Sequence, residues 1–213
     1  MNATLRQRFR FHGHIAGVGS ASGVRIVVGR WVDSPLGTFG DAMVERADGH
    51  RILLAPDAGV AQFVAATYSF DEIRMEPFAI TGDDDAWHVR SDSLHLDLAV
   101  GRPTVLGRLL SLVPSSVATA PWWCALTNVV ARVVLRGVRT RGSIGTRREW
   151  YGATGNRVIT GASGTFDGVD LGQLQRVAPQ PQFGFSSTPP RPSVTDVVTT
   201  VEVSAQDRIP GDR

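Results

Sequence analysis

One stretch carries the clearest structural signal in the chain: residues 38–57, which read TFGDAMVERADGHRILLAPD. Two segments with strand-like patterns, Thr38–Arg46 and Arg51–Ala55, flank the dipeptide Asp48-Gly49. Asp-Gly favours a two-residue hairpin because such a turn needs a positive φ, which glycine adopts without steric cost. The sequence therefore predicts an antiparallel hairpin here.

A short helix is expected directly after the hairpin. Pro56-Asp57 opens it, because the Asp57 side chain can accept a hydrogen bond from the free amides at the start of a helix. An apolar stripe follows at helical spacing, formed by Val60, Ala61, Phe63 and Val64. This order predicts a helix that packs on the hairpin.

Most of the remaining chain has the period of two that is typical of strands. We expect strands in residues 5–11, 22–32, 68–80, 87–100 and 193–204, and further strands from residue 136 with turns at 142–143, 152–156 and 161–168. Residues 94, 96, 98 and 100 are apolar and should face inward. The glycine-rich residues 13–23 are expected to connect two strands, and residues 82–85 to form a turn.

Helical patterns are confined to two further segments, 103–113 and the one that begins at Pro121, and residues 178–192 are expected to form an extended arm. The predicted fold class is mainly β (α+β): a curved antiparallel or mixed β-barrel or β-cone, with two or three short helices packed on it. Residues 1–204 are expected to form a single domain, and residues 205–213 a frayed tail.

The chain contains no lysine, because all 22 basic residues are arginine. No side-chain amine is therefore available as a nucleophile, since arginine stays protonated. The single cysteine, Cys124, cannot form an internal disulfide. Residues 1–11 have no apolar core of signal-peptide length, and the most apolar stretch, residues 117–135, is interrupted by polar residues and a proline. We expect a cytoplasmic protein that does not enter a membrane.

The segment Ser34-Pro-Leu-Gly-Thr-Phe-Gly-Asp41 resembles a motif of the acetoacetate decarboxylase-like superfamily, whose members often carry Ser-Pro-Val-Gly-Pro-Tyr-x-Glu. The resemblance implies a curved β-cone around a small, largely apolar pocket, with Asp41 in the place of the motif's acid. Family decarboxylases use a lysine that forms a Schiff base. In this chain the position of that lysine falls near Tyr68–Ile73, a segment without lysine. The resemblance therefore implies the scaffold without Schiff-base chemistry.

A small organic acid, or an amphipathic molecule with one anionic end, is the expected ligand. Five residues are predicted to bind it: Arg30, Asp41, Tyr68, Glu72 and Arg74. Arginine grips a carboxylate through two parallel hydrogen bonds, and a carboxyl group in a dry pocket could act as an acid or base. The sequence pattern leaves open whether Asp41 faces the interior, because Phe39 and Met43 share its face of the strand.

Two alternatives to a binding protein remain open from the sequence. One is a lysine-independent lyase or hydratase that uses Asp41. The other is an interaction module that uses the basic stretch Arg132–Arg148, although a net charge of +2 argues against nucleic acid as a partner.

No metal and no cofactor are expected. His12 and His14 point the same way along a strand, but no cluster of further metal ligands accompanies them in the sequence. The oligomeric state is left open, a homo-oligomer included.

Overall fold

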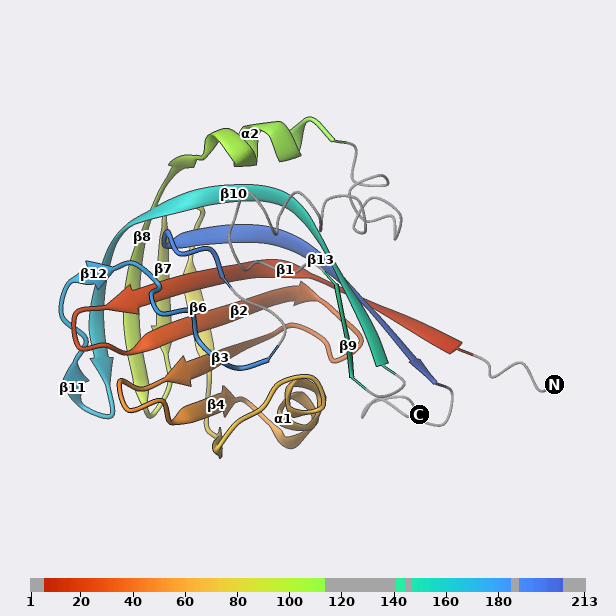
Figure 1. The fold of residues 1–213 in the computed structure, drawn as a ribbon, viewed down its shortest axis with the longest axis horizontal. Helices are drawn as coiled ribbons and strands as arrows, with labels where there is room; N and C mark the ends of the chain where they lie inside the picture. The colour runs from red at the N-terminus through yellow and green to blue at the C-terminus, as the bar shows by residue number, and fades with distance from the viewer. Residues whose placement is uncertain (1–5, 114–140, 145–146, 185–187, 205–213) are drawn as a thin grey trace.

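The computed structural model describes residues 6–113, 141–144, 147–184 and 188–204 (Figure 1). Within these residues, thirteen strands form one sheet with the order β5-β4-β3-β2-β1-β13-β10-β8-β7-β6. Three short strands lie off this path: β9 and β11 pair with β10, and β12 pairs with β1. The pairing of β4 with β5 is parallel and the other pairings are antiparallel, so the sheet is mixed.

The element bounds are as follows: β1 Arg6–Ser20, β2 Arg25–Asp33, β3 Phe39–Glu45, β4 Arg51–Ala55, α1 Ala58–Ala65, β5 Glu72–Met75, β6 Ala79–Gly82, β7 Ala86–Arg90, β8 Leu94–Pro103, α2 Val105–Ser111, β9 Arg141–Ile144, β10 Arg147–Phe166, β11 Val169–Asp170, β12 Leu174–Gln175 and β13 Ser193–Ser204.

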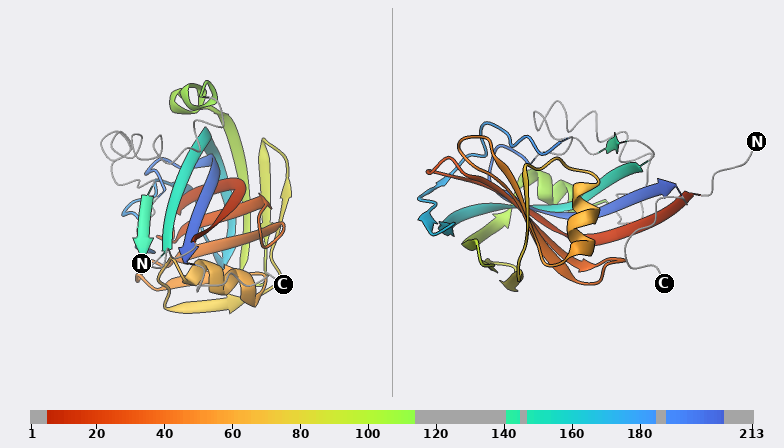
Figure 2. Two further views of the ribbon diagram at one scale, coloured as in Figure 1. Left: turned by 90° about the vertical axis from the view of Figure 1, so that its right-hand side faces the viewer. Right: turned by 90° about the horizontal axis from the view of Figure 1, so that it is seen from below.

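The sheet curls strongly (Figures 1 and 2). One of its faces encloses the main core. We call this the inner face. Its core brings side chains of β1–β4 together with those of β7, β8 and β10, including Ile26, Trp87 and Leu96. The predicted inward row of β8 is confirmed, because Leu94, Leu96, Leu98 and Val100 all belong to this core. The predicted fold class, a curved mixed sheet with short helices, is likewise confirmed.

The hairpin and helix predicted from residues 38–57 both form. β3 and β4 pair antiparallel, and Gly49 in the turn has a φ of 88°. Asp57 caps α1, since its Oδ1 accepts a hydrogen bond of 2.9 Å from the amide of Val60. α1 packs Val60 and Val64 against the side of the sheet that we call the outer face (Figure 2).

Two predicted connections are instead parts of long strands. β1 continues through the glycines of residues 13–19 to Ser20, and β10 runs through residues 152–156 and 161–166. These glycines lie where other backbone or side-chain atoms come close: a Cβ on Gly19 would stand 2.2 Å from the carbonyl oxygen of Arg176. Glycines at these positions therefore indicate close packing of the backbone and not a turn.

Other boundaries differ in detail. The predicted strand 68–80 is two strands, β5 and β6, separated around Pro77, and the predicted strand 87–100 is the hairpin of β7 and β8. Thr104 caps α2. The predicted helix from Pro121, the side chains of the Arg132–Arg148 stretch and the tail 205–213 lie outside the described residues. Neither described helix has the length and apolar character that crossing a membrane requires.

Candidate functional site

Arg30 and Asp41 lie on neighbouring strands but on opposite faces of the sheet. In the β2–β3 register, Arg30 faces Gly40 and Asp41 faces Gly29, and residues directly opposite each other share a face. Side chains two residues apart along a strand share a face, so Arg30 lies on the inner face with Val28. Asp41 lies on the outer face with Phe39 for the same reason. The two residues therefore cannot hold one small ligand between them.

Arg30 is a half-buried cation on the inner face. Its guanidinium carbon lies 5.6 Å from the centre of the Trp87 ring, and Trp87 itself is 1% exposed. Among the described residues, Arg30 makes no side-chain hydrogen bond or ion pair. Its N–H donors are thus free for an anion, while the indole ring holds the group in place.

His14 lies beside Arg30 and forms a dyad with Asp196. The β1 register places His14 opposite Arg30 on one side and opposite Asp196 on the other. The Nδ1 atom of His14 is 2.7 Å from Oδ1 of Asp196. An ionised carboxylate can only accept, so Nδ1 carries the hydrogen and Nε2 is left as an acceptor.

The dyad and Arg30 share one aromatic neighbour. The His14 ring meets the Trp87 ring edge-on, with 6.1 Å between their centres. About a third of each dyad side chain is exposed, 32% for His14 and 35% for Asp196. We call the group Arg30, His14, Trp87 and Asp196 the inner-face cluster; it joins a fixed cation, an accessible imidazole and an apolar ring.

The backbone of β10 leaves space for the Asp196 carboxylate because a glycine lies beside it. Gly155 of β10 pairs with Asp196 beside a register shift between Ala153 and Gly155. A Cβ at Gly155 would lie 2.1 Å from Oδ2 of Asp196, so any other residue would displace the carboxylate.

Asp41 is buried on the outer face, where 5% of the residue is exposed. Its Oδ1 accepts a hydrogen bond of 2.9 Å from Nε1 of Trp31. Burial raises the pKa of Asp41 to about 7, and the Trp31 hydrogen bond offsets part of that effect. Asp41 is therefore a titratable group in the packed layer beside α1, away from Arg30.

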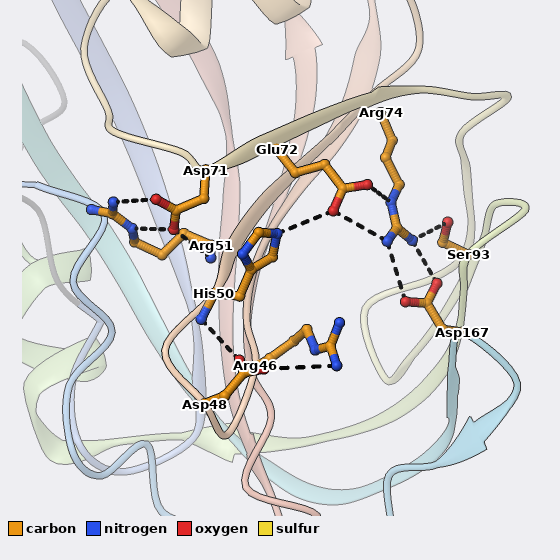
Figure 3. A network of polar contacts seen from close by, with 9 residues as sticks. All are labelled: Arg46, Asp48, His50, Arg51, Asp71, Glu72, Arg74, Ser93 and Asp167. Atoms are coloured by element: carbon orange, nitrogen blue, oxygen red, sulfur yellow. Dashed lines mark hydrogen bonds and ion pairs between the residues drawn. The ribbon is translucent and has the colours of Figure 1, made fainter.

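Glu72 and Arg74 come together in a network of ion pairs at the edge of the sheet (Figure 3). Nε of Arg74 lies 2.7 Å from Glu72, and its terminal nitrogens contact Asp167 at 2.5 Å and Ser93 at 2.9 Å. His50 contacts the second oxygen of Glu72 at 3.2 Å. Arg74 already binds two carboxylates there, which leaves it little capacity for a third.

Tyr68 follows α1 and packs against the outer-face group of β4 and α1 that includes Leu53 and Val60. The five residues expected to bind a ligand thus occupy separate places: Arg30 on the inner face, Asp41 and Tyr68 on the outer side, and Glu72 with Arg74 at the edge. Their role in binding stays a prediction. In the part of the chain that the structure describes, no three His, Cys, Asp or Glu side chains gather in a way that could hold a metal ion.

Most of the inner-face cluster is not apparent from the sequence. The pattern places His12 and His14 on one face of a strand, but it indicates no role for Trp87 or Asp196. Asp196 is one of two acids, with Glu202, among the Val and Thr residues of the last strand. Its pairing with His14, 182 residues away, does not follow from local pattern.

No protein-family model and no curated protein sequence matches this chain. Among solved structures, the chain is similar to an acetoacetate decarboxylase from Legionella pneumophila, with 9% sequence identity and a TM-score of 0.43. The match covers 96% of this chain and 88% of that one.

Proposed function

We propose that this chain binds a small organic acid on the inner face of its sheet, with Arg30 as the anion anchor. The observation that carries the proposal is the state of Arg30: a half-buried guanidinium, held over Trp87, with no carboxylate beside it among the described residues. A cation in a partly dry place is costly to leave unpaired, so an anionic partner is favoured.

The surroundings of Arg30 favour a ligand with both an anionic and an apolar part. The partly buried Phe78 and Ile80 pack against the inner core that also holds the Trp87 ring beneath Arg30. A carboxylate can take two parallel hydrogen bonds from the guanidinium while its carbon chain contacts these apolar groups.

Arg74 is the weaker candidate for the same role. Its guanidinium contacts Glu72, Asp167 and Ser93, so an incoming acid would have to displace carboxylates already bound. We therefore assign the anchor to Arg30 and a structural role to Arg74.

Schiff-base decarboxylation is excluded from the proposal because the chain has no lysine. We also propose a cytoplasmic location, since a single cysteine gives no reason to expect an oxidising compartment.

The proposal predicts acid binding that depends on Arg30. Calorimetric titration of the protein with a library of small carboxylic acids should give hits whose affinity falls about 10- to 100-fold in Arg30→Gln, because a hydrogen bond to a charged group contributes about 1.5–3 kcal/mol. The matched control is Arg90→Gln, an exposed arginine of β7 that pairs with Asp97. If no acid binds, or if both variants bind the hits as the wild type does, the proposal is wrong.

A further inference from the structure

The imidazole of His14 lies next to the proposed anchor, on the strand that pairs with that of Arg30. We infer that His14 is a general base for a carbon acid held by Arg30, and that the ligand is a 2-oxo acid with a hydrogen on C3. This inference rests on the proposed function and adds a reaction to it: reversible enolisation of the bound acid.

The dyad has the arrangement that a base needs. Asp196 accepts the hydrogen bond from Nδ1 at 2.7 Å, which fixes both the ring orientation and the tautomer. Nε2 then carries the free electron pair, and no described residue hydrogen-bonds to it. About a third of the His14 side chain is exposed, so a ligand can approach it from solvent.

Arg30 supplies the electrophilic partner for such a base. Both groups contact the same indole ring, the guanidinium at 5.6 Å and the imidazole at 6.1 Å from its centre. His14 and Arg30 are also directly opposite each other on paired strands, so an acid held by the guanidinium lies beside the imidazole. The buried Trp87 ring, which both groups contact, makes their surroundings more apolar, and this strengthens the interactions of the charged groups.

The chemistry of the base selects the ligand class. The α-hydrogen of a simple carboxylate is too weakly acidic for an imidazole, whereas a keto group acidifies the carbon beside it. In a 2-oxo acid, the carboxylate and the keto oxygen lie side by side and can both accept from one guanidinium.

The step balances without a further reactant. Nε2 of His14 takes a proton from C3, the C3–H electron pair forms the C2=C3 bond, and the keto oxygen becomes an enolate oxygen beside Arg30. Return of a proton from His14 to C3 restores the acid. In heavy water the returned proton is a deuteron.

The experiment uses 2-oxobutyrate as the probe and follows loss of its C3 methylene signal by proton NMR in D2O, against a buffer blank. The wild type should exchange the C3 hydrogens at least tenfold faster than the blank. In His14→Asn the exchange rate should fall to that of the blank, while the affinity for 2-oxobutyrate stays within about twofold of the wild-type value. The asparagine amide can still donate to Asp196, so the local contact is kept. Butyrate should bind without exchange.

The matched control is His88→Gln. His88 makes the same 2.7 Å contact from Nδ1 to a carboxylate, that of Asp97, but on the exposed outer side of β7, and its loss should leave the exchange rate unchanged. For Asp196, a positioning residue, the readout is the tautomer: ¹⁵N shifts of the His14 ring should report Nδ1–H in the wild type and a mixture in Asp196→Asn.

The outcomes separate the two proposals. If 2-oxobutyrate binds through Arg30 but exchanges no faster than the blank, or if His14→Asn still exchanges, the inference is wrong and the binding proposal stands. If 2-oxobutyrate does not bind, or binds Arg30→Gln equally well, both are wrong. Should His14→Asn fail to fold, the ¹⁵N signals of wild-type His14 decide: saturating 2-oxobutyrate must shift Nε2, and an unchanged signal overturns the inference.

Discussion

Asp41 is a buried carboxyl group with an elevated pKa and a single hydrogen bond from Trp31 among the described residues. In the unfolded chain its pKa returns to about the ordinary value of 3.8. Between these two values the folded protein holds a proton that the unfolded chain has released. Stability should therefore fall as the pH rises from about 4 to about 7, and the contribution of Asp41 should then level off.

The substitution Asp41→Asn should remove this pH dependence. Asparagine has the same shape, cannot ionise and still offers Oδ1 to Trp31. The variant should match the wild type near pH 4 and exceed it at pH 8 by up to about 4 kcal/mol, since each pKa unit corresponds to about 1.4 kcal/mol. Urea unfolding at both pH values measures the difference, with the exposed Asp92→Asn as control. Equal stability of wild type and Asp41→Asn at pH 8 would contradict the raised pKa.

At the scale of elements, the edge strand β5 depends on side chains for part of its attachment. It pairs with β4 on one side, and its Arg74 reaches the far end of β10 through Asp167 and the ring of Phe166. This contact joins two regions of the curled sheet that no backbone ladder connects. The hydrogen bonds from Arg74 and His50 lower the pKa of Glu72, so the network weakens as the pH falls into the acid range.

A double-mutant cycle of Arg74→Gln and Asp167→Asn should give a coupling of about 1 kcal/mol that declines with added salt, because both side chains are partly exposed. Asparagine tolerates the positive φ of Asp167. The control cycle is Arg90 with Asp97, a pair at 2.6 Å whose side chains are both 43% exposed, which should couple less. A control coupling as large as that of Arg74 and Asp167 would count against this account.

At the scale of the whole molecule, the sequence predicts what is local. The Asp48-Gly49 hairpin, the Asp57 cap and the inward row of β8 follow from the spacing of neighbouring residues, and all three are present. The glycines of β1 predict a connection but lie within a strand, because they accommodate chain segments that pass close by and are distant in sequence.

The candidate site was less predictable for the same reason. Arg30 was named from its residue type, but its orientation depends on the β2 register and on Trp87 from a distant strand. Asp41 is predicted to lie in the same ligand site as Arg30, but its side chain lies on the opposite face of the sheet. The pair His14 and Asp196 arises from strand pairing between the two ends of the chain, which residue patterns do not encode.

The absence of lysine gives a prediction for the protein as a whole. Incubation with acetoacetate followed by borohydride should leave no reduced adduct on any side chain, because trapping requires an amine. The terminal amine is the one exception. Peptide mapping by mass spectrometry checks the result, with a lysine-containing protein as a positive control, and an adduct on an internal peptide would be incompatible with it.

The position of β13 has a consequence for how the protein is made. β13 lies between β1 and β10 in the middle of the sheet, although it is formed by residues 193–204. While the ribosome is still translating the preceding segments, the nascent chain has β1 and β10 with one backbone edge each unpaired, and such edges are templates for aggregation. A product released early by the ribosome therefore carries two bare strand edges and lacks Asp196, so incomplete translation should give aggregates rather than a weakly active protein.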